Sequence, residues 1–275
     1  DVDDYFEAKA QLFTPEHARA GVVNCDDEYG RRLIDTATID LTTFSLEGRA
    51  ADWQATDIRS SHSSSDFTLV SPSGDHFDVT VPMPGRFNVA NAVAAIAALS
   101  ITGADTQSLV DGLAHLSGVP GRMETIQSEL GFRVVVDYAH KPDALTAILT
   151  ALRPVTQGAL TIVVGAGGDR DTGKRPLMGQ ISAKFADVVV ITDDNPRSED
   201  PAQIRAEVAA GVQADAEVHQ IPGRKAAIAF ALANAKPGDT VVIAGKGHET
   251  GQEIAGVVHP FDDRAVVREI LEGLS

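Results

Sequence analysis

The stretch LTIVVGAGGDRDTGKR, residues 160–175, decides the fold that we expect for this chain. Its first five residues are apolar or β-branched and are typical of a buried strand. The glycines that follow indicate a tight turn, and a helical pattern begins near Arg175. A short apolar strand, a Gly-rich turn and a helix form the repeating unit of a parallel α/β sheet.

The same unit recurs on both sides of this stretch. Apolar strands are expected at residues 134–137, 160–165, 188–192, 218–221 and 241–244. Amphipathic helices are expected at residues 143–152, 175–185, 201–210, 224–235 and 263–271. This alternation predicts a mainly parallel sheet covered by helices on both faces. Ligands of such sheets bind at the carboxyl ends of the strands, where the polar clusters of this chain also fall.

The first part of the chain has a different pattern. Helices are expected at residues 3–13, 88–101 and 106–116, and residues 38–81 alternate as β-strands do. The turn PSGD, residues 72–75, predicts a hairpin between residues 67–71 and 76–81. The run GVPG, residues 118–121, interrupts both patterns. We therefore predict two domains, residues 1–120 and 121–275.

Composition excludes several classes of partner. The formal net charge of -16 argues against nucleic acid, which requires a basic surface. No apolar run is long enough for a transmembrane helix, so we expect no membrane insertion. The single cysteine, Cys25, fits a cytoplasmic protein and reads as a strand-end residue. The chain starts at Asp1 rather than at a methionine, so we expect it to be a processed product or an excised fragment.

The loop GDRDTGK, residues 168–174, nearly matches a phosphate-binding P-loop. Arg175 stands where a P-loop has the Ser or Thr that binds Mg²⁺, so we do not expect a true P-loop. We expect instead a Gly-rich loop that points Arg170 and Lys174 into a cleft. The alternative is a plain turn between strand and helix.

Two further motifs suit an amino acid as ligand. In TDDNPR, residues 192–197, a guanidinium can bind a carboxylate, and Asp and Asn can bind an ammonium. The alternative is a turn that caps the helix after Glu199. In GKGHE, residues 245–249, the glycines allow a ligand to approach closely. The alternative there is a solvated charge cluster.

Two other motifs suit a nucleotide. Asn88 and Asn91 lie three residues apart in GRFNVAN and are expected on one helical face. Arg122 in GRME and Asp137 in DYAHKP lie at or near the predicted domain boundary, where we expect an interdomain cleft.

Together these motifs resemble the Mur ligase family. The resemblance rests on YFEAK, GRFNVANAVAA, GRME, VDYAHKPDAL, GAGGDRDTGKRPLMG, TDDNPR and AGKGHE, in this order, and covers nearly the whole chain. It implies an α/β fold: the later part of the central ATP-binding domain, followed by a Rossmann-like C-terminal domain with a mainly parallel sheet. The family's N-terminal domain and P-loop are not expected in this chain.

The resemblance also implies an activity and a set of site residues. The family forms an amide bond through an acyl phosphate, with ATP and Mg²⁺ as cofactors. The motifs are most similar to the branch that adds meso-diaminopimelate to UDP-MurNAc-dipeptide. By resemblance, Lys9 carries a carbamate that holds Mg²⁺, and the catalytic residues are Lys9, Arg122 and Asp137. The nucleotide-binding positions are Asn88, Asn91, Arg122, Asp137, His140 and Lys141. The diaminopimelate positions are Arg170, Asp194, Asn195, Pro196, Arg197, Gly245 and Glu249.

Three alternatives stay open at this point. One is the lysine-adding branch of the same family, and another is a ligase of the cyanophycin or folyl-polyglutamate type. The third is a non-catalytic module that binds an amino acid, which the missing P-loop favours. We expect the chain alone to be inactive in ATP hydrolysis.

Overall fold

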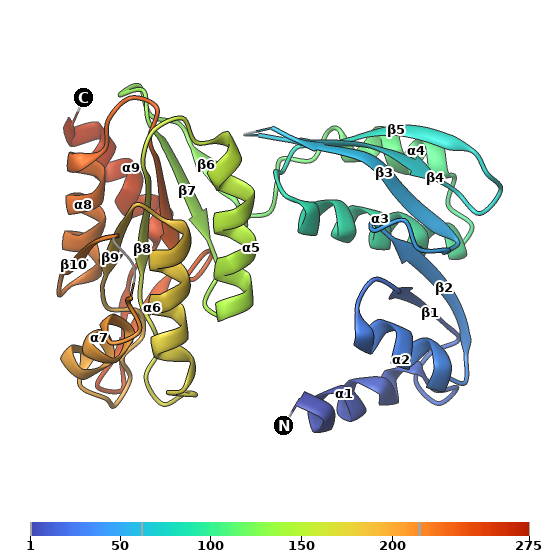
Figure 1. Cartoon of the computed structure of the whole chain (residues 1–275), viewed down its shortest axis with the longest axis horizontal. Helices are drawn as coiled ribbons and strands as arrows, with labels where there is room; N and C mark the ends of the chain where they lie inside the picture. The colour runs from blue at the N-terminus through green and yellow to red at the C-terminus, as the bar shows by residue number, and fades with distance from the viewer. Residues whose placement is uncertain (1, 62, 214–215, 275) are drawn as a thin grey trace. The chain divides into compact units, whose positions relative to one another are not determined.

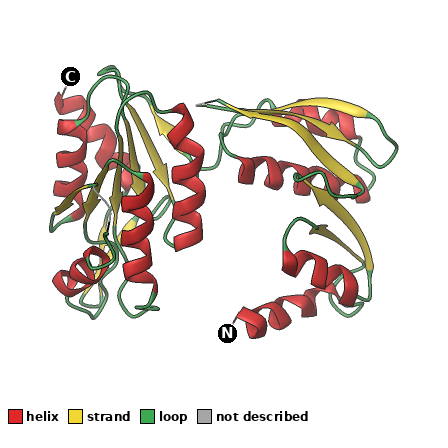
Figure 2. Ribbon diagram, in the orientation of Figure 1, coloured by secondary structure: helices red, strands yellow, loops and turns green. Residues whose placement is uncertain are grey.

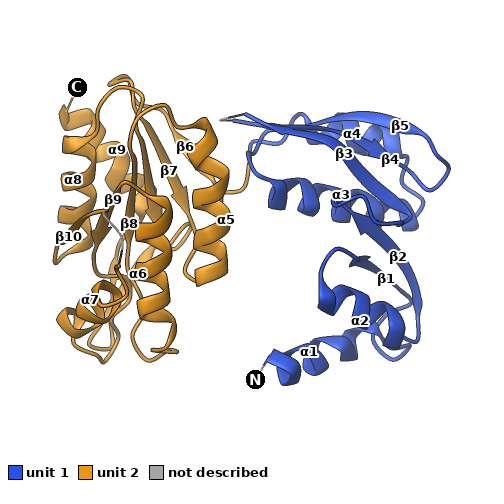
Figure 3. Cartoon of the chain, in the orientation of Figure 1, with its two compact units in different colours: residues 1–117 blue, residues 118–275 orange. Residues whose placement is uncertain are grey.

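The computed structural model describes residues 2–61, 63–213 and 216–274. The chain divides into two compact units, residues 1–117 and 118–275 (Figure 3). None of the described helices is long and apolar enough to cross a membrane. Each unit has its own sheet.

The first unit begins with helical elements and one edge of its sheet. Helix α1 spans Val2–Ala10, and a short 3₁₀ helix, η1, spans Gln11–Phe13. Strand β1 (Ala20–Asn24) leads into helix α2 (Glu28–Thr36). Asp27 caps helix α2, because its side chain accepts a hydrogen bond from the Gly30 amide at 2.6 Å.

A five-stranded sheet forms the body of this unit, in the order β1-β2-β3-β4-β5 (Figures 1 and 2). Its remaining strands are β2 (Asp40–Ser45), β3 (Trp53–Ser60), β4 (Ser65–Val70) and β5 (His76–Val81). Strands β4 and β5 form the predicted antiparallel hairpin. Helices α3 (Arg86–Ile101) and α4 (Thr106–Leu113) cover one face of the sheet and complete an apolar core around Leu69 and Val93.

The second unit has a six-stranded sheet in the order β10-β9-β8-β11-β7-β6. The strands are β6 (Glu124–Ile126), β7 (Arg133–Asp137), β8 (Leu160–Val164), β9 (Val188–Ile191), β10 (Glu217–Gln220) and β11 (Thr240–Ala244). All neighbours pair in parallel except β6 and β7. The prediction of a mainly parallel sheet is therefore confirmed.

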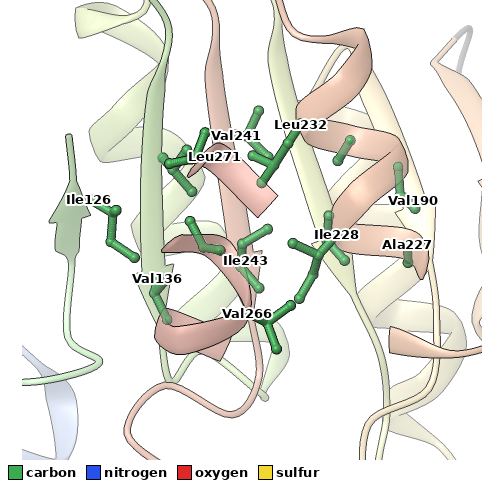
Figure 4. Close-up of a cluster of buried hydrophobic side chains, with 14 of the residues drawn as sticks. Ile126, Val136, Val190, Ala227, Ile228, Leu232, Val241, Ile243, Val266 and Leu271 are labelled. Atoms are coloured by element: carbon green, nitrogen blue, oxygen red, sulfur yellow. The ribbon is translucent and has the colours of Figure 1, made fainter. Parts of the chain in front are cut away.

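Helices cover both faces of this sheet, as Figure 1 shows. Helices α5 (Pro142–Leu152), α6 (Lys174–Phe185) and α7 (Pro201–Ala209) lie on one face, with a 3₁₀ turn, η2 (Arg153–Val155), after α5. Helices α8 (Arg224–Asn234) and α9 (Asp263–Leu274) lie on the other. Alternate strand residues such as Val136, Val190 and Ile243 pack against Ile228 and Leu271 (Figure 4).

Two features of this unit were not predicted. Strand β6 adds an antiparallel edge, and a hairpin of β12 (Gly251–Ile254) and β13 (Val257–Pro260) follows the GKGHE motif. The hairpin is joined to the TDDNPR loop, because the Arg197 amide donates to the Glu253 carbonyl and the Ala255 amide donates to the Arg197 carbonyl. It therefore helps to fix the candidate site described next.

Candidate active site

A cavity of about 310 Å³ lies in the second unit, at the carboxyl ends of its parallel strands. Four strand-end motifs meet there because β7, β8, β9 and β11 run in the same direction. The lining consists mainly of charged and glycine residues: Tyr138, His140, Lys141, Gly167, Arg170, Lys174, Asp194, Asn195, Arg197, Gly245 and Glu249. Of the predicted diaminopimelate positions, Pro196 is buried and does not line the cavity.

The two aspartates of TDDNPR have different surroundings. The carboxylate of Asp193 already has protein partners. It pairs with Arg205 and accepts a hydrogen bond from the Gly223 amide at 2.8 Å. Asp194 is only 8% exposed and lines the cavity. One of its oxygens, Oδ1, accepts from the Asn195 amide at 2.7 Å. The other, Oδ2, has no hydrogen-bond partner among the described residues and is available for a ligand.

Gly245 is required beside Asp194. Its φ of +119° is a conformation that L side chains rarely adopt. A Cβ atom there would lie 2.6 Å from Asp194 Oδ2. Behind it, the fully buried Arg224 donates to the Ala244 carbonyl at 2.9 Å and forms two hydrogen bonds of 2.7 Å with Asp263. This buried pair fixes the end of β11.

Asn195, Lys246 and Glu249 form one hydrogen-bonded group. The ammonium of Lys246 donates to Asn195 Oδ1 at 2.9 Å and to Glu249 Oε2 at 3.0 Å. Asn195 Nδ2 also donates to Glu249 Oε2, at 3.1 Å. Burial is the largest influence on the Glu249 carboxyl and raises its pKa, but the bonds and charge of Lys246 and the Asn195 amide together hold that pKa below its usual value.

Arg197 is held by the β12–β13 hairpin and by the Gly-rich loop. Its Nε lies 3.2 Å from Glu253 Oε2, and its NH1 donates to the Gly168 carbonyl at 2.7 Å. Arg197 does not pair with the nearby acids Glu199 and Asp200, because Glu199 pairs with Arg175 and Asp200 caps helix α7. The side chain of Arg197 still lines the cavity and is 21% exposed.

The Gly-rich loop is not a P-loop. Arg175 is fully buried and pairs with Glu199 at 2.8 Å and Glu207 at 2.7 Å. It also donates to the Gly167 carbonyl at 3.2 Å, so it fixes the loop from behind. Arg170 and Lys174 both line the cavity, as the cleft interpretation expects. Burial lowers the pKa of the Lys174 ammonium, against the opposing attraction of Asp194 and Asp171.

The predicted nucleotide residues of the second unit surround Tyr138, which the sequence did not single out. The Arg122 guanidinium lies 4.7 Å from the centre of the Tyr138 ring, and the His140 ring lies 4.5 Å away. Asp137 is bound to the backbone, accepting from the Met123 and Ala139 amides at 2.8 and 2.7 Å. Burial raises its pKa in spite of these bonds.

The remaining predicted residues lie in the first unit. Asn88 is buried, and its Nδ2 donates to the Pro84 carbonyl at 2.8 Å, which secures the start of α3. Asn91 is exposed, so the two amides differ in environment although they are three residues apart. Lys9 is also exposed, with its Nζ 5.2 Å from the centre of the Tyr5 ring.

The described residues fit the phosphate groups of ATP better than they fit Mg²⁺. A carbamate on Lys9 would be an oxygen ligand of the kind that Mg²⁺ prefers. However, no group of three or more His, Cys, Asp or Glu side chains in the described part of the chain could hold a metal ion. These residues therefore do not form a complete magnesium site. Lys141, Lys174 and Arg170 line one cavity and offer it positive charge, which fits phosphate groups.

Sequence reasoning missed the residues that support the site from behind. Lys246 lies within the GKGHE motif, but nothing in the neighbouring sequence indicates that it is fully buried against Asn195. Gln252 is also buried, and its Nε2 donates to the Asp194 carbonyl at 2.6 Å. Glu253 binds both the Arg197 side chain and, through its amide at 3.0 Å, Asn195 Oδ1. Their partners are far away in sequence.

Two family models match the chain. The Mur ligase middle domain matches residues 1–99, and the Mur ligase glutamate ligase domain matches residues 121–247. The second match contains the strands β7–β11 and most of the residues that line the cavity.

Similar proteins cover nearly the whole chain. A protein of Streptomyces coelicolor named UDP-N-acetylmuramoyl-L-alanyl-D-glutamate–2,6-diaminopimelate ligase is 54% identical over 98% of this chain and 55% of its own length. A solved structure of a protein with that name is 42% identical, with a TM-score of 0.64 over 100% of this chain and 57% of its own. The MurF ligase of Thermotoga maritima in complex with ADP is 18% identical, with a TM-score of 0.72 over 100% of this chain and 59% of its own, a likeness of fold alone. The chain spans about half the length of the curated relatives it matches.

The role of Arg175 gives a direct test of the P-loop interpretation. Arg175→Ser completes the P-loop string, but we expect no gain of ATP binding and a lower Tm. The reason is that Glu199 and Glu207 lose the guanidinium whose hydrogen bonds lower their pKa values. A carboxylate with a lowered folded-state pKa stabilises the fold at neutral pH and loses that effect as the pH falls through the folded value. The Tm difference from wild type should therefore shrink in acid.

Calorimetric unfolding between pH 7 and pH 3 and a titration with ATP measure both effects. Lys184→Ser, at an exposed position of the same helix, is the control for placing serine in α6. ATP binding gained by Arg175→Ser, or a Tm equal to that of the control, would contradict the structural role.

Proposed function

The chain belongs to the Mur ligase family, and we propose that it is the amino-acid-binding part of a ligase that joins meso-diaminopimelate to UDP-MurNAc-L-Ala-D-Glu. Members of this family are ATP-dependent ligases. One observation carries the proposal for this chain: a single cavity of the second unit contains both carboxylates and guanidinium groups at the positions of the family's motifs. The single cysteine and the nucleotide-linked substrate support a cytoplasmic location.

The cavity has the charges that one end of diaminopimelate requires. Each end of that molecule has an ammonium and a carboxylate on the same carbon. Asp194 Oδ2, which has no partner among the described residues, suits the ammonium, together with Glu249. Arg170 suits the carboxylate, because none of the ion pairs among the described residues involves it. Arg197 adds a second guanidinium at the same wall.

The reaction places the other end of the amino acid toward the incoming acyl group. The D-glutamate carboxylate is first converted to an acyl phosphate by phosphoryl transfer from ATP. The free amine of diaminopimelate then attacks the acyl carbon, the C–O bond to phosphate breaks, and the amine loses a proton. Lys141, Lys174 and His140 line the same cavity and can stabilise the charge on the departing phosphate. Binding and orientation are therefore the contribution of this unit.

Selection between diaminopimelate and lysine tests the proposal. Lysine lacks the second carboxylate, so the arginines lose their partner when it binds, and each charge-assisted bond contributes roughly 1.5–3 kcal/mol. In the complete ligase we expect Arg197→Ala to lower kcat/KM for diaminopimelate by about tenfold to a hundredfold. The preference over lysine should shrink as well. Steady-state kinetics with both amino acids measure this.

Two further variants test whether Arg197 contacts the substrate or only supports the β12–β13 hairpin. Arg268→Ala removes an exposed arginine that pairs with Glu124 on the same unit. It should leave kcat/KM for diaminopimelate and the preference over lysine unchanged. Glu253→Gln removes the charge partner of Arg197 but leaves the guanidinium. If Glu253→Gln reproduces the whole effect of Arg197→Ala, Arg197 acts on the hairpin and the proposed contact with substrate is wrong.

Gly245 provides an independent test at the other wall of the cavity. Gly245→Ala should weaken diaminopimelate binding at least tenfold, because the added methyl displaces Asp194 Oδ2. Gly256→Ala is the matched control, since Gly256 also has a positive φ, of +76°, but has open space around it. Both variants bear a backbone strain of about 1–3 kcal/mol. Titration calorimetry in which the two variants bind equally would count against a ligand at Asp194.

We propose, from the resemblance of the YFEAK motif to the family's pattern, that Lys9 carries the carbamate that holds Mg²⁺. An ordinary lysine has a pKa of about 10.4 and must lose its proton before it reacts with CO₂. Alanine has no amine that could form a carbamate. In the complete ligase, Lys9→Ala should be inactive for this reason, and short carboxylic acids should restore part of the activity. Turnover assays with and without acetate measure this. Full activity of the variant without any added acid would exclude the assignment.

A further inference from the structure

We propose that Lys246 is a positioning residue that sets the donor and acceptor pattern of the amino-acid pocket through Asn195 and Glu249. The inference rests on the proposed function and deepens it. Lys246 has no exposed surface, so it cannot touch a ligand in the cavity, and it is absent from the cavity lining. Its ammonium is nevertheless bonded to two residues that do line the cavity.

The first effect concerns the Asn195 amide. Asn195 Oδ1 accepts from the Lys246 ammonium at 2.9 Å and from the Glu253 amide at 3.0 Å. A rotated amide would direct its NH₂ group at both of these donors, and the two bonds would be lost. The orientation is therefore fixed, with Nδ2 beside Glu249 and one N–H of that nitrogen left for other partners.

The second effect concerns Glu249. Its Oε2 accepts from both Lys246 and Asn195, whereas no hydrogen bond among the described residues is formed by Oε1. The buried cation thus uses one oxygen and leaves the other for a ligand ammonium. Without Lys246, the half-buried carboxylate would lose its strongest bond and its nearest opposite charge. The pocket would then present a carboxyl group that is less fixed and more readily protonated.

Protonation provides a signature that a purely structural lysine would not produce. Glu249 faces positive charge from Lys246, from His140 after β7 and from Arg224 on α8. Lys246 contributes the most to lowering the Glu249 pKa, whereas burial raises it. Removal of Lys246 should therefore raise that pKa. Because the ionised carboxylate binds the ammonium, affinity should then be lost at a higher pH than in the wild type.

The test is titration calorimetry of meso-diaminopimelate with this 275-residue chain between pH 5 and pH 8. We expect Lys246→Met to raise Kd at least tenfold at pH 7.5 and to move the acid loss of affinity to higher pH. Lys225→Met is the control, because Lys225 pairs with Glu269 on the surface of α8. The double variant Lys246→Met, Glu249→Gln should bind about as weakly as the weaker single variant, since both changes act on one group.

Each outcome decides the inference. The inference is overturned if Lys246→Met and wild type bind with equal affinity. It is also overturned if the variant binds more weakly but loses its affinity at the same acid pH as the wild type. If Lys246→Met does not fold, Lys246→Gln is measured with the same criteria, because its amide can donate to Asn195 or Glu249 but carries no charge. A wild-type chain that does not bind diaminopimelate overturns the proposed function and the inference with it. Wild-type binding with an unaffected Lys246 variant overturns the inference alone.

Discussion

Three buried cations hold the loops of the candidate site in place. Arg175, Arg224 and Lys246 are the largest fully buried side chains in the described part of the chain. A charge in the protein interior is strongly destabilising unless it is paired and hydrogen-bonded. Each cation therefore requires carboxylates or carbonyl oxygens at fixed positions, and the loops at the strand ends supply them. Arg175 joins Gly167 to Glu199, Arg224 joins Ala244 to Asp263, and Lys246 joins Asn195 to Glu249. These bonds pre-organise the cavity wall.

The sequence predicted the strands and helices of the second unit because their signals are local. A buried parallel strand such as β8 is apolar throughout, and each helix has its own periodicity. The roles of the buried cations could not be predicted in the same way. Arg175 pairs with residues 24 and 32 positions away, and Lys246 pairs with Asn195 across 51 positions. The hairpin β12–β13 was missed because its strands are short and β13 is exposed along its length.

The site was predicted from motifs rather than from geometry, so the prediction named residues that line one cavity but not the partners of those residues. The strand-end rule brings Arg170, Asp194, Arg197 and Glu249 to one cavity without any knowledge of side-chain contacts. The partner of Arg197 was not predictable, because Glu253 lies on the unpredicted hairpin. In the same way, nothing in the order Asp193-Asp194 indicates that the first pairs with Arg205 while the second keeps a free oxygen.

The excess of negative charge on the chain is compatible with a pocket that binds carboxylates. Exposed charges are screened over about 8–10 Å at physiological ionic strength, so the groups within the cavity decide what binds there. Under the proposed function, the guanidinium groups and the carboxylates of the cavity each disfavour a different kind of ligand. A ligand end with only an ammonium, as in lysine, leaves the guanidinium of Arg170 without an anionic partner. A ligand end with only a carboxylate, as in glutamate, leaves Asp194 and Glu249 facing a third negative group. Only an end with both groups on one carbon satisfies both walls. Selectivity therefore follows from the penalty of unpaired charges at least as much as from attraction.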